Sequence, residues 1–186
     1  MLEGKVALIT GAAKGIGRAI ALAMAAEKAT VVINYNGSKE RAEQVLEEVK
    51  ALGADGCVYQ CNVADTADTD AMIKEIIKTY GHLDILVNNA GITRDNLIMK
   101  MSEEDFDAVI NANLKGCFNT IKAVSRQMLR QRSGRIINIL LYPVSLEMQD
   151  RPIILHPKQE SSVLPELWPV SLPAVESRSM ELHRVL

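Results

Sequence analysis

Three glycines with an informative spacing follow the first apolar run of the chain. Gly11, Gly15 and Gly17 lie between residues 5–10, an apolar run with β-branched side chains, and residues 19–26, an alanine-rich stretch. The run indicates a buried strand and the stretch a helix. Glycines let a backbone approach a pyrophosphate closely, and a helix N-terminus offers unpaired N–H groups and a partial positive charge. The stretch predicts an anion site, although a turn whose glycines serve only close packing stays open.

Predicted strands and predicted helices alternate along the chain, and these elements must position the glycine turn. Further β-branched or apolar runs predict strands, and stretches with a helical apolar period predict helices between them. Ser38 and Ser102 are the expected N-caps of two of these helices. The expected strands are 5–10, 30–35, 56–61, 84–87 and 134–139, and the expected helices are 19–26, 38–52, 66–80 and a long helical region from 102. This alternation predicts an α/β fold, an incomplete Rossmann-type doubly wound parallel sheet in the order 3-2-1-4-5.

The end of the second strand bears on the kind of nucleotide that the turn would hold. Many dinucleotide folds place there an acidic residue that binds the ribose 2′-hydroxyl, whereas this chain has Asn34, Tyr35 and Asn36. Without a carboxylate a 2′-phosphate is tolerated, and positive charge is available from Lys14, Lys39 and Arg41. We therefore expect NADP(H) rather than NAD(H). A solvated turn position for Lys14 stays an alternative.

Two motifs resemble one known family. Thr10 with the G-x-x-x-G-x-G turn resembles the cofactor motif of the short-chain dehydrogenase/reductase family, and the sequence Asn88-Asn89-Ala90-Gly91 matches a second motif of that family. Asn62 and Val63 resemble the pair that contacts the adenine ring. The resemblance implies a cofactor site made of Thr10, Gly11, Ala13, Lys14, Gly15, Ile16, Gly17, Asn36, Asn62, Val63, Asn89, Ala90 and Gly91.

Residues 92–97 resemble more specifically one group of this family, the bacterial 3-oxoacyl-(acyl-carrier-protein) reductases. The resemblance implies NADPH-dependent reduction of a 3-oxoacyl thioester carried on acyl carrier protein, in fatty-acid synthesis. Asn113 matches a catalytic-tetrad asparagine whose backbone carbonyl holds a water, and Arg132 matches a position that docks the acidic carrier. The alternatives are that Asn113 has only a structural role and that Arg132 is a solvated residue at the end of a helix. The family also forms homotetramers.

The resemblance covers residues 1–139 and stops there. The family continues with a serine that polarises the carbonyl, and then with Y-x-x-x-K, in which a tyrosine of lowered pKa protonates the alkoxide. Here Leu140 follows Ile139, and Tyr142, the last tyrosine, has Leu146 rather than lysine at i+4. Asn113 is thus the only tetrad member left. We expect a catalytically dead chain.

Residues 140–186 have the pattern expected when a gene is translated in the wrong reading frame. All eleven glycines lie at or before Gly134, and all six prolines lie after Tyr142. Residues 153–158 can be written ATT-ATT-CTG-CAT-CCA-AAG, which reads Tyr-Ser-Ala-Ser-Lys when each codon starts one nucleotide earlier. Under permitted codon choices, residues 165–184 give in the same frame a stretch that resembles the family's next helix, strand and V-A-P-G loop. We therefore expect a partial NADP(H)-binding Rossmann domain at 1–139 and an out-of-frame, disordered tail at 140–186.

Composition narrows the functional classes. Net charge is −2, hydrophobic residues make up 48% of the 186, and the only basic cluster is 126–135, so a nucleic-acid footprint is not expected. No run approaches the roughly 20 apolar residues of a membrane span, and three cysteines without metal spacing predict core thiols and no metal site. We expect a cytoplasmic protein that does not form the family's tetramer. An active reductase, an inactive NADP(H)-binding domain and a non-functional frameshift product remain the three alternatives.

Overall fold

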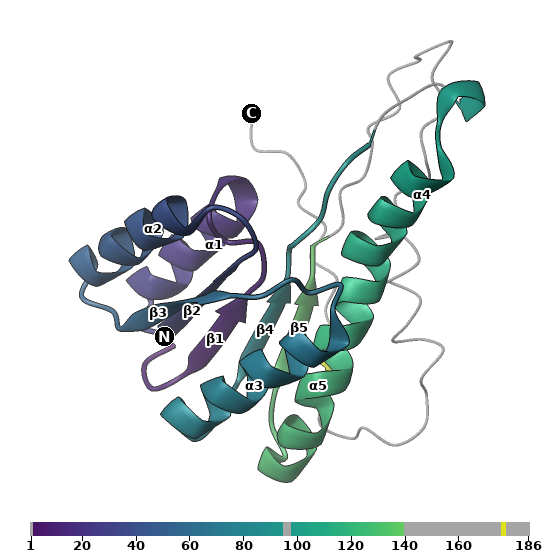
Figure 1. Cartoon of the computed structure of the whole chain (residues 1–186). Coiled ribbons are helices and arrows are strands. Elements are labelled where there is room, and N and C mark those ends of the chain that lie inside the picture. The colour runs from purple at the N-terminus through teal and green to yellow at the C-terminus, as the bar shows by residue number, and fades with distance from the viewer. Residues whose placement is uncertain (1, 95–97, 140–175, 178–186) are drawn as a thin grey trace.

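The computed structural model describes residues 2–94, 98–139 and 176–177, and these form a twisted parallel sheet between two layers of helices (Figure 1). The sheet order is β3-β2-β1-β4-β5-β6. The five strands from the predicted region confirm the order 3-2-1-4-5. The strands are β1 Val6–Ile9, β2 Thr30–Tyr35, β3 Gly56–Gln60, β4 Ile85–Asn88, β5 Arg135–Asn138 and β6 Glu176–Ser177. The helices are α1 Gly15–Ala26, α2 Lys39–Ala51, α3 Thr66–Tyr80, η1 Ile98–Lys100, α4 Glu103–Ile110, η2 Asn111–Lys115 and α5 Gly116–Gln131.

Alternation along the strands divides the core between the two faces of the sheet. Ala7 and Ile9 of β1 belong to the cluster beneath α1 and α2, whereas Val6 and Leu8 belong to the cluster beneath α3 and α5. The same alternation holds in β2 and β4, because side chains change face at every residue of a strand. The sheet is therefore buried on both faces, as parallel sheets require.

Three helices are preceded by a serine or an aspartate that could cap the first turn, and two of these side chains do so. The Asp65 carboxylate accepts hydrogen bonds from Ala67 N (2.7 Å) and Asp68 N (3.0 Å) at the start of α3. Ser102 Oγ accepts one from Asp105 N (3.1 Å) at the start of α4, as predicted. Ser38 occupies the N-cap position of α2, but its side chain makes no capping hydrogen bond.

The long helical region after Ser102 is one rod with an irregular turn inside it. α4 passes through the π-helical turn η2 into α5 without an intervening loop. π-helical turns inside α-helices are often found at functional sites, because the extra residue redirects side chains. Here the turn contains Asn113.

The structure adds one strand that the sequence does not predict. β6 pairs in parallel with β5, Glu176 opposite Arg135 and Ser177 opposite Ile136. Its two residues pair with part of the edge of β5, whose backbone N–H and C=O groups would otherwise be exposed. The rest of the tail lies outside the described residues, so its predicted disorder stays a prediction.

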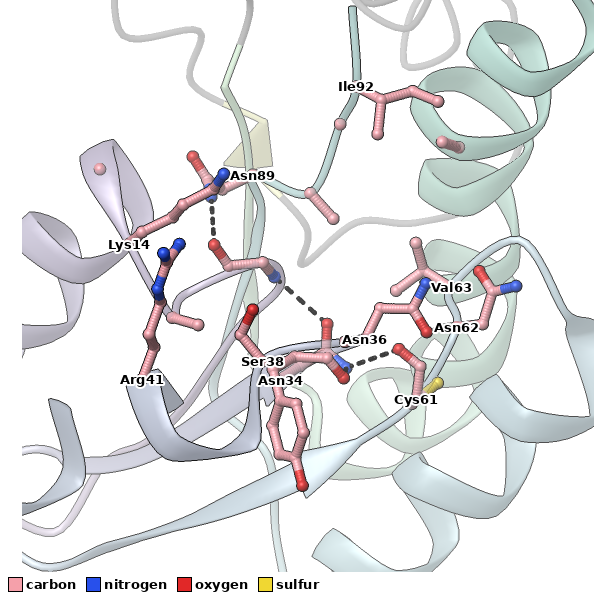
Figure 2. A pocket seen from close by; sticks show the side chains of 18 of the residues that line it. Lys14, Asn34, Asn36, Ser38, Arg41, Cys61, Asn62, Val63, Asn89 and Ile92 are labelled. Carbon is pink, nitrogen blue, oxygen red and sulfur yellow. Dashed lines mark hydrogen bonds between the residues drawn. The ribbon is translucent and has the colours of Figure 1, made fainter. Parts of the chain in front are cut away.

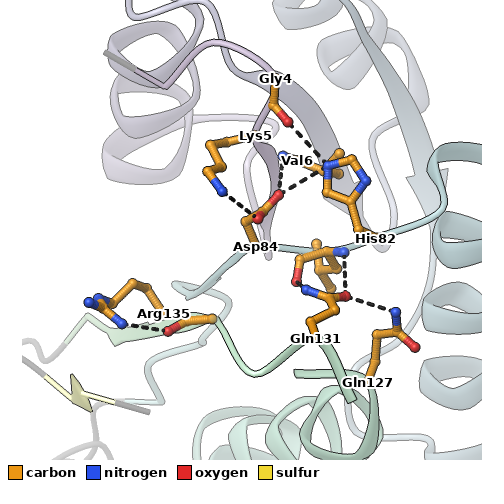
Figure 3. Close-up of polar contacts among 10 residues, drawn as sticks. Gly4, Lys5, Val6, His82, Asp84, Gln127, Gln131 and Arg135 are labelled. Atoms are coloured by element: carbon orange, nitrogen blue, oxygen red, sulfur yellow. Dashed lines mark hydrogen bonds and ion pairs between the residues drawn. The ribbon is translucent and has the colours of Figure 1, made fainter. Parts of the chain in front are cut away.

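The two edges of the sheet differ in character. At the carboxyl ends of the strands a cavity opens beside the glycine turn (Figure 2). At the amino ends, the buried carboxylate of Asp84 joins strands: it accepts hydrogen bonds from Val6 N (3.0 Å) and Lys5 Nζ (3.0 Å), and lies 3.2 Å from His82 Nε2 (Figure 3). The Asp84 backbone carbonyl accepts a further bond from Arg135 N (2.8 Å). Asp84 thus fixes β1, β4 and β5 at one edge.

We predict that Asp84→Ala lowers the free energy of unfolding by about 2–3 kcal/mol, because it leaves the buried Val6 N–H without its acceptor and removes a charge-assisted bond. Urea unfolding of the full chain measures this. The matched control is Glu75→Ala, which removes a half-exposed carboxylate that lies 3.4 Å from Lys78 and should change stability by less than about 1 kcal/mol. Equal effects of the two substitutions would contradict the assigned role of Asp84.

Candidate nucleotide-binding site

The cavity measures about 390 Å³ and lies outside the carboxyl ends of β1, β2 and β4, where parallel α/β sheets bind ligands. Most of the predicted cofactor residues line it. They are Gly11, Ala13, Lys14, Gly15, Ile16, Asn36, Asn62, Val63, Asn89, Ala90 and Gly91. Of the predicted set, Thr10 and Gly17 are not among the lining residues that the structure describes.

The glycine turn needs its glycines for different reasons. Gly11 has φ +63°, and a Cβ there would lie 2.8 Å from Ala90 Cα. Gly17 lies inside α1, where a Cβ would lie 2.4 Å from Asn89 Nδ2 and 2.7 Å from the Gly11 carbonyl oxygen. Gly11 therefore permits the fold of the turn and Gly17 the close contact of α1 with the loop after β4. Gly17 is thus a glycine that close packing requires, which is the alternative given for the turn. Gly15, at the start of α1, instead faces the cavity.

Thr10 and Asn89 fasten the turn to the end of β4. Thr10 Oγ1 is buried; it accepts hydrogen bonds from Asn89 N and Ala90 N, both 2.9 Å, and donates to the Val87 carbonyl oxygen at 3.3 Å. Asn89 Nδ2 donates back to the carbonyl oxygens of Thr10 (3.0 Å) and Gly11 (3.2 Å). Thr10 thus supports the site from below, which is why it does not line the cavity.

The charge of the cavity wall is positive in the described residues. Lys14 and Arg41 line it from the glycine turn and from α2, and Figure 2 shows them on the same side. No aspartate or glutamate is among the described lining residues. Lys39, the third predicted cation, does not line the cavity; its ammonium lies 3.6 Å from the Glu43 carboxylate. An anion at the start of α1 would meet two cations and no opposing carboxylate.

The opposite wall follows β3. Asn62 Oδ1 accepts a hydrogen bond from Ala64 N (3.1 Å), which closes a tight turn after the strand. The Val63 carbonyl accepts from Asn119 Nδ2 (2.9 Å) and from Thr69 Oγ1 (3.3 Å). Val63 is therefore held by helices α3 and α5, and Asn62 by the turn that follows it, as a fixed side of the cavity.

Asn113 is almost fully buried, and its side chain clamps the loop after β4. Its Oδ1 accepts from Ile92 N (2.8 Å) and its Nδ2 donates to the Ile92 carbonyl oxygen (2.9 Å). Ile92 lines the cavity, so η2 positions one wall through this asparagine. The role that the family resemblance implies depends on the backbone carbonyl of Asn113 and stays a prediction.

Comparison with known proteins identifies the family of the chain. The sequence profile described as short chain dehydrogenase matches residues 5–140. The chain belongs to the short chain dehydrogenase family.

Curated relatives in this family include 3-oxoacyl-(acyl-carrier-protein) reductases. The reductase FabG of Staphylococcus aureus (strain Mu50) is 59% identical over 135 residues, which cover 73% of this chain and 55% of FabG. The reductase of Synechocystis sp. is 50% identical over 138 residues, which cover 74% of this chain and 56% of the relative. The chain spans about half the length of these relatives.

Solved structures agree with the family. A short chain dehydrogenase from Mycobacterium avium is 41% identical with a TM-score of 0.69, and the match covers 74% of this chain and 54% of that one. A metagenomic short-chain oxidoreductase in complex with NADP is 29% identical with a TM-score of 0.76, covering 87% of this chain and 71% of that one.

The family position matched by Arg132 lies away from the cavity. Arg132 ends α5 in the left-handed conformation, with φ 53°. α5 runs antiparallel to the strands, so its C-terminus lies near the start of β5, at the edge opposite the cavity. The structure does not bring Arg132 and the cofactor residues together. None of the helices in the described ranges has the length and apolar character needed to cross a bilayer.

Sequence reasoning missed Asn34 as a site residue. Asn34 is 2% exposed and lines the cavity, and its carboxamide bonds to both the glycine turn and β3. The only signal was a polar residue near the carboxyl end of the otherwise largely apolar strand β2. Cys61 also lines the cavity, although the sequence indicated only a core thiol; burial raises the pKa of its thiol to about 11.

We predict that iodoacetamide modifies Cys61 at least about a hundredfold more slowly in the folded chain than in guanidinium at pH 8. A thiol of pKa about 11 rather than 9.0 holds about a hundredfold less thiolate at that pH, and only thiolate reacts. Mass spectrometry of the modified peptides measures the rates, with the more exposed Cys57 as an internal control. Equal rates in the folded and unfolded chain would contradict the buried placement.

The same raised pKa fixes the sign of a pH effect on stability. The folded chain keeps the Cys61 proton up to about pH 11, whereas the unfolded chain releases it near 9.0. This contribution to stability is therefore present below pH 9 and is lost as the pH rises through about 11. Cys61→Ser removes the titration and provides the control.

Proposed function

We propose that the described domain binds NADP(H), with the pyrophosphate at the N-terminus of α1 and the adenosine 2′-phosphate beside Lys14 and Arg41. The observation that carries the proposal is the cavity at the glycine turn, which combines a helix N-terminus and two cations with no carboxylate among its described lining residues. Membership of the family, and the NADP named for one similar solved structure, support it.

The residues present fit such a group. Gly11 and Gly15 have positive φ, and the space beside Gly15 is open to a distance of 4 Å from the position of a Cβ. A phosphate can therefore approach the backbone there. Asn62 and Val63 would flank the adenine ring, while Asn89, Ala90 and Gly91 continue the wall beyond the pyrophosphate. A bound NADPH would supply the hydride for reduction of a carbonyl.

We also propose that the parent activity of this sequence is NADPH-dependent reduction of 3-oxoacyl-(acyl-carrier-protein) in cytoplasmic fatty-acid synthesis. The names of the relatives support the reduction of 3-oxoacyl-(acyl-carrier-protein), and the rest follows from the family resemblance. The chain as printed lacks what that reaction needs after Ile139: Leu140 and Leu141 follow where the family's strand runs into a serine, and no later tyrosine has lysine at i+4. Asn113 remains, and Arg132 is the proposed contact for the carrier. An inactive NADP(H)-binding domain is the function that we propose for the folded chain.

A non-functional frameshift product is the second candidate. The observation that favours it is that residues 153–158 permit a choice of codons that reads Tyr-Ser-Ala-Ser-Lys in the neighbouring frame. Resequencing the gene across the codons for Asn138 to Pro143 tests it, with a missing or added nucleotide as the expected finding. The loss of the family's tetramer stays a prediction.

We predict that NADP binds more tightly than NAD and that Lys14→Glu removes most of the difference. The substitution places a carboxylate where the 2′-phosphate would lie, which should weaken NADP binding about tenfold or more and NAD binding less. Isothermal titration calorimetry of the full chain measures both. Lys78→Glu on α3 is the matched control and should change neither affinity. Equal affinities for NADP and NAD, or no effect of Lys14→Glu, would overturn the assignment of the 2′-phosphate.

We predict that the chain as printed does not oxidise NADPH in the presence of an acetoacetyl thioester. Loss of the general acid alone costs about 10²- to 10⁴-fold in rate, and the serine is missing as well. The control is the frame-restored protein, which contains the serine and Y-x-x-x-K. Turnover by the printed chain within tenfold of the restored protein would show that other residues supply the proton.

A further inference from the structure

Asn34 connects two sides of the cavity that are far apart in sequence. Its Oδ1 accepts a hydrogen bond from Gly11 N (3.2 Å), in the glycine turn. Its Nδ2 donates to the Cys61 carbonyl oxygen (3.0 Å) and also lies 3.4 Å from the Tyr59 carbonyl oxygen, at the end of β3. Figure 2 shows the carboxamide between the turn and Cys61, with one hydrogen bond to each.

The backbone of Asn34 strengthens the same connection. Its carbonyl oxygen accepts a hydrogen bond from Ala12 N at 2.9 Å. Two successive amides of the glycine turn, Gly11 and Ala12, are therefore held by one residue of β2. The turn that presents the start of α1 to the cavity depends on where Asn34 lies.

We propose that Asn34 is a positioning residue for nucleotide binding, one that sets the separation between the glycine turn and the wall formed by Asn62 and Val63. The inference rests on the proposed NADP(H) function, because it concerns the same cavity. Cys61, whose carbonyl Asn34 holds, directly precedes that wall. A nucleotide that spans from adenine to pyrophosphate must touch both sides, so its affinity depends on their separation.

Only a carboxamide meets the requirements of this position. One atom must accept from the Gly11 N–H, and the other must donate toward the carbonyl oxygens of β3. An aspartate has the same shape and keeps the acceptor, but it places a second carboxylate oxygen against the carbonyls of Tyr59 and Cys61. The loss of a donor in this buried place should push β3 and the turn apart.

A purely structural role makes a different prediction from a positioning role. Gln131 provides the comparison, because its carboxamide clamps the backbone in the same way at the opposite edge of the sheet: Oε1 accepts from Leu83 N (3.2 Å), and Nε2 donates to the Leu83 carbonyl oxygen (3.1 Å; Figure 3). Asn34→Asp and Gln131→Glu are therefore matched substitutions, one beside the cavity and one away from it.

The test measures the melting temperature and the affinity for NADP and for NAD, which has no 2′-phosphate for a new carboxylate to repel, in the full chain and in both variants. We expect both variants to melt at lower temperature, but only Asn34→Asp to lose affinity, by about tenfold or more for each ligand; Gln131→Glu should stay within about twofold of the unchanged chain. If Asn34→Asp binds as tightly as Gln131→Glu, the positioning role is wrong while the proposed function stands. If the unchanged chain binds neither ligand, the proposed function fails and the inference with it.

Hydrogen exchange of the unchanged chain decides the question if Asn34→Asp does not fold. Adding adenosine 2′,5′-bisphosphate should slow exchange together in residues 11–17, 34–36 and 59–63, because Asn34 links these three segments. Protection limited to residues 11–17 would overturn the inference.

Discussion

The structure of the site depends on one constraint: the turn between β1 and α1 must bend sharply and still present the N–H groups of α1 to the cavity. Three side chains meet this constraint by binding the turn from both sides. Thr10 and Asn89 bond it to the end of β4, and Asn34 bonds it to β2 and β3. Because these bonds occupy the Gly11 and Ala12 amides, the turn has one geometry, and the start of α1 at Gly15 remains directed at the cavity.

Two kinds of interaction in the remainder of the domain support this geometry of the turn. Apolar side chains on both faces of the sheet hold the strands and helices together, and buried polar groups fix their register. Asn88 is an example: its Oδ1 accepts from Thr120 Oγ1 (2.7 Å), and its Nδ2 donates to Asn138 Oδ1 (2.9 Å), which joins α5, β4 and β5 just below the cavity. Such buried networks tolerate little change, because the loss of one partner leaves a buried polar group without a hydrogen bond and without water to replace it. The same parts of the fold thus carry both stability and site geometry.

The sequence predicts those features of the fold that depend on local patterns. Helix α3 is found at the predicted bounds, Thr66–Tyr80, because its apolar period, its Asp65 cap and the final Gly81 agree. The lining residues of the glycine turn could be predicted because their motif is local, and those at 62–63 and 89–91 because each belongs to a short motif that resembles the family. Asn34 and the side-chain clamp of Asn113 could not, since their partners at Cys61 and Ile92 are distant in sequence. The π-helical turn and β6 had no local signal at all.

We propose that the described domain is a nucleotide site organised around the N-terminus of α1. The most direct measurement is a ¹H–¹⁵N NMR titration of the full chain with NADP. We expect the largest chemical-shift changes at the amides of Gly15, Ile16 and Gly17, smaller ones at Asn62 and Val63, and none near Asp84 at the opposite edge of the sheet. Changes centred elsewhere, or no change at the start of α1 at saturating NADP, would contradict this proposal.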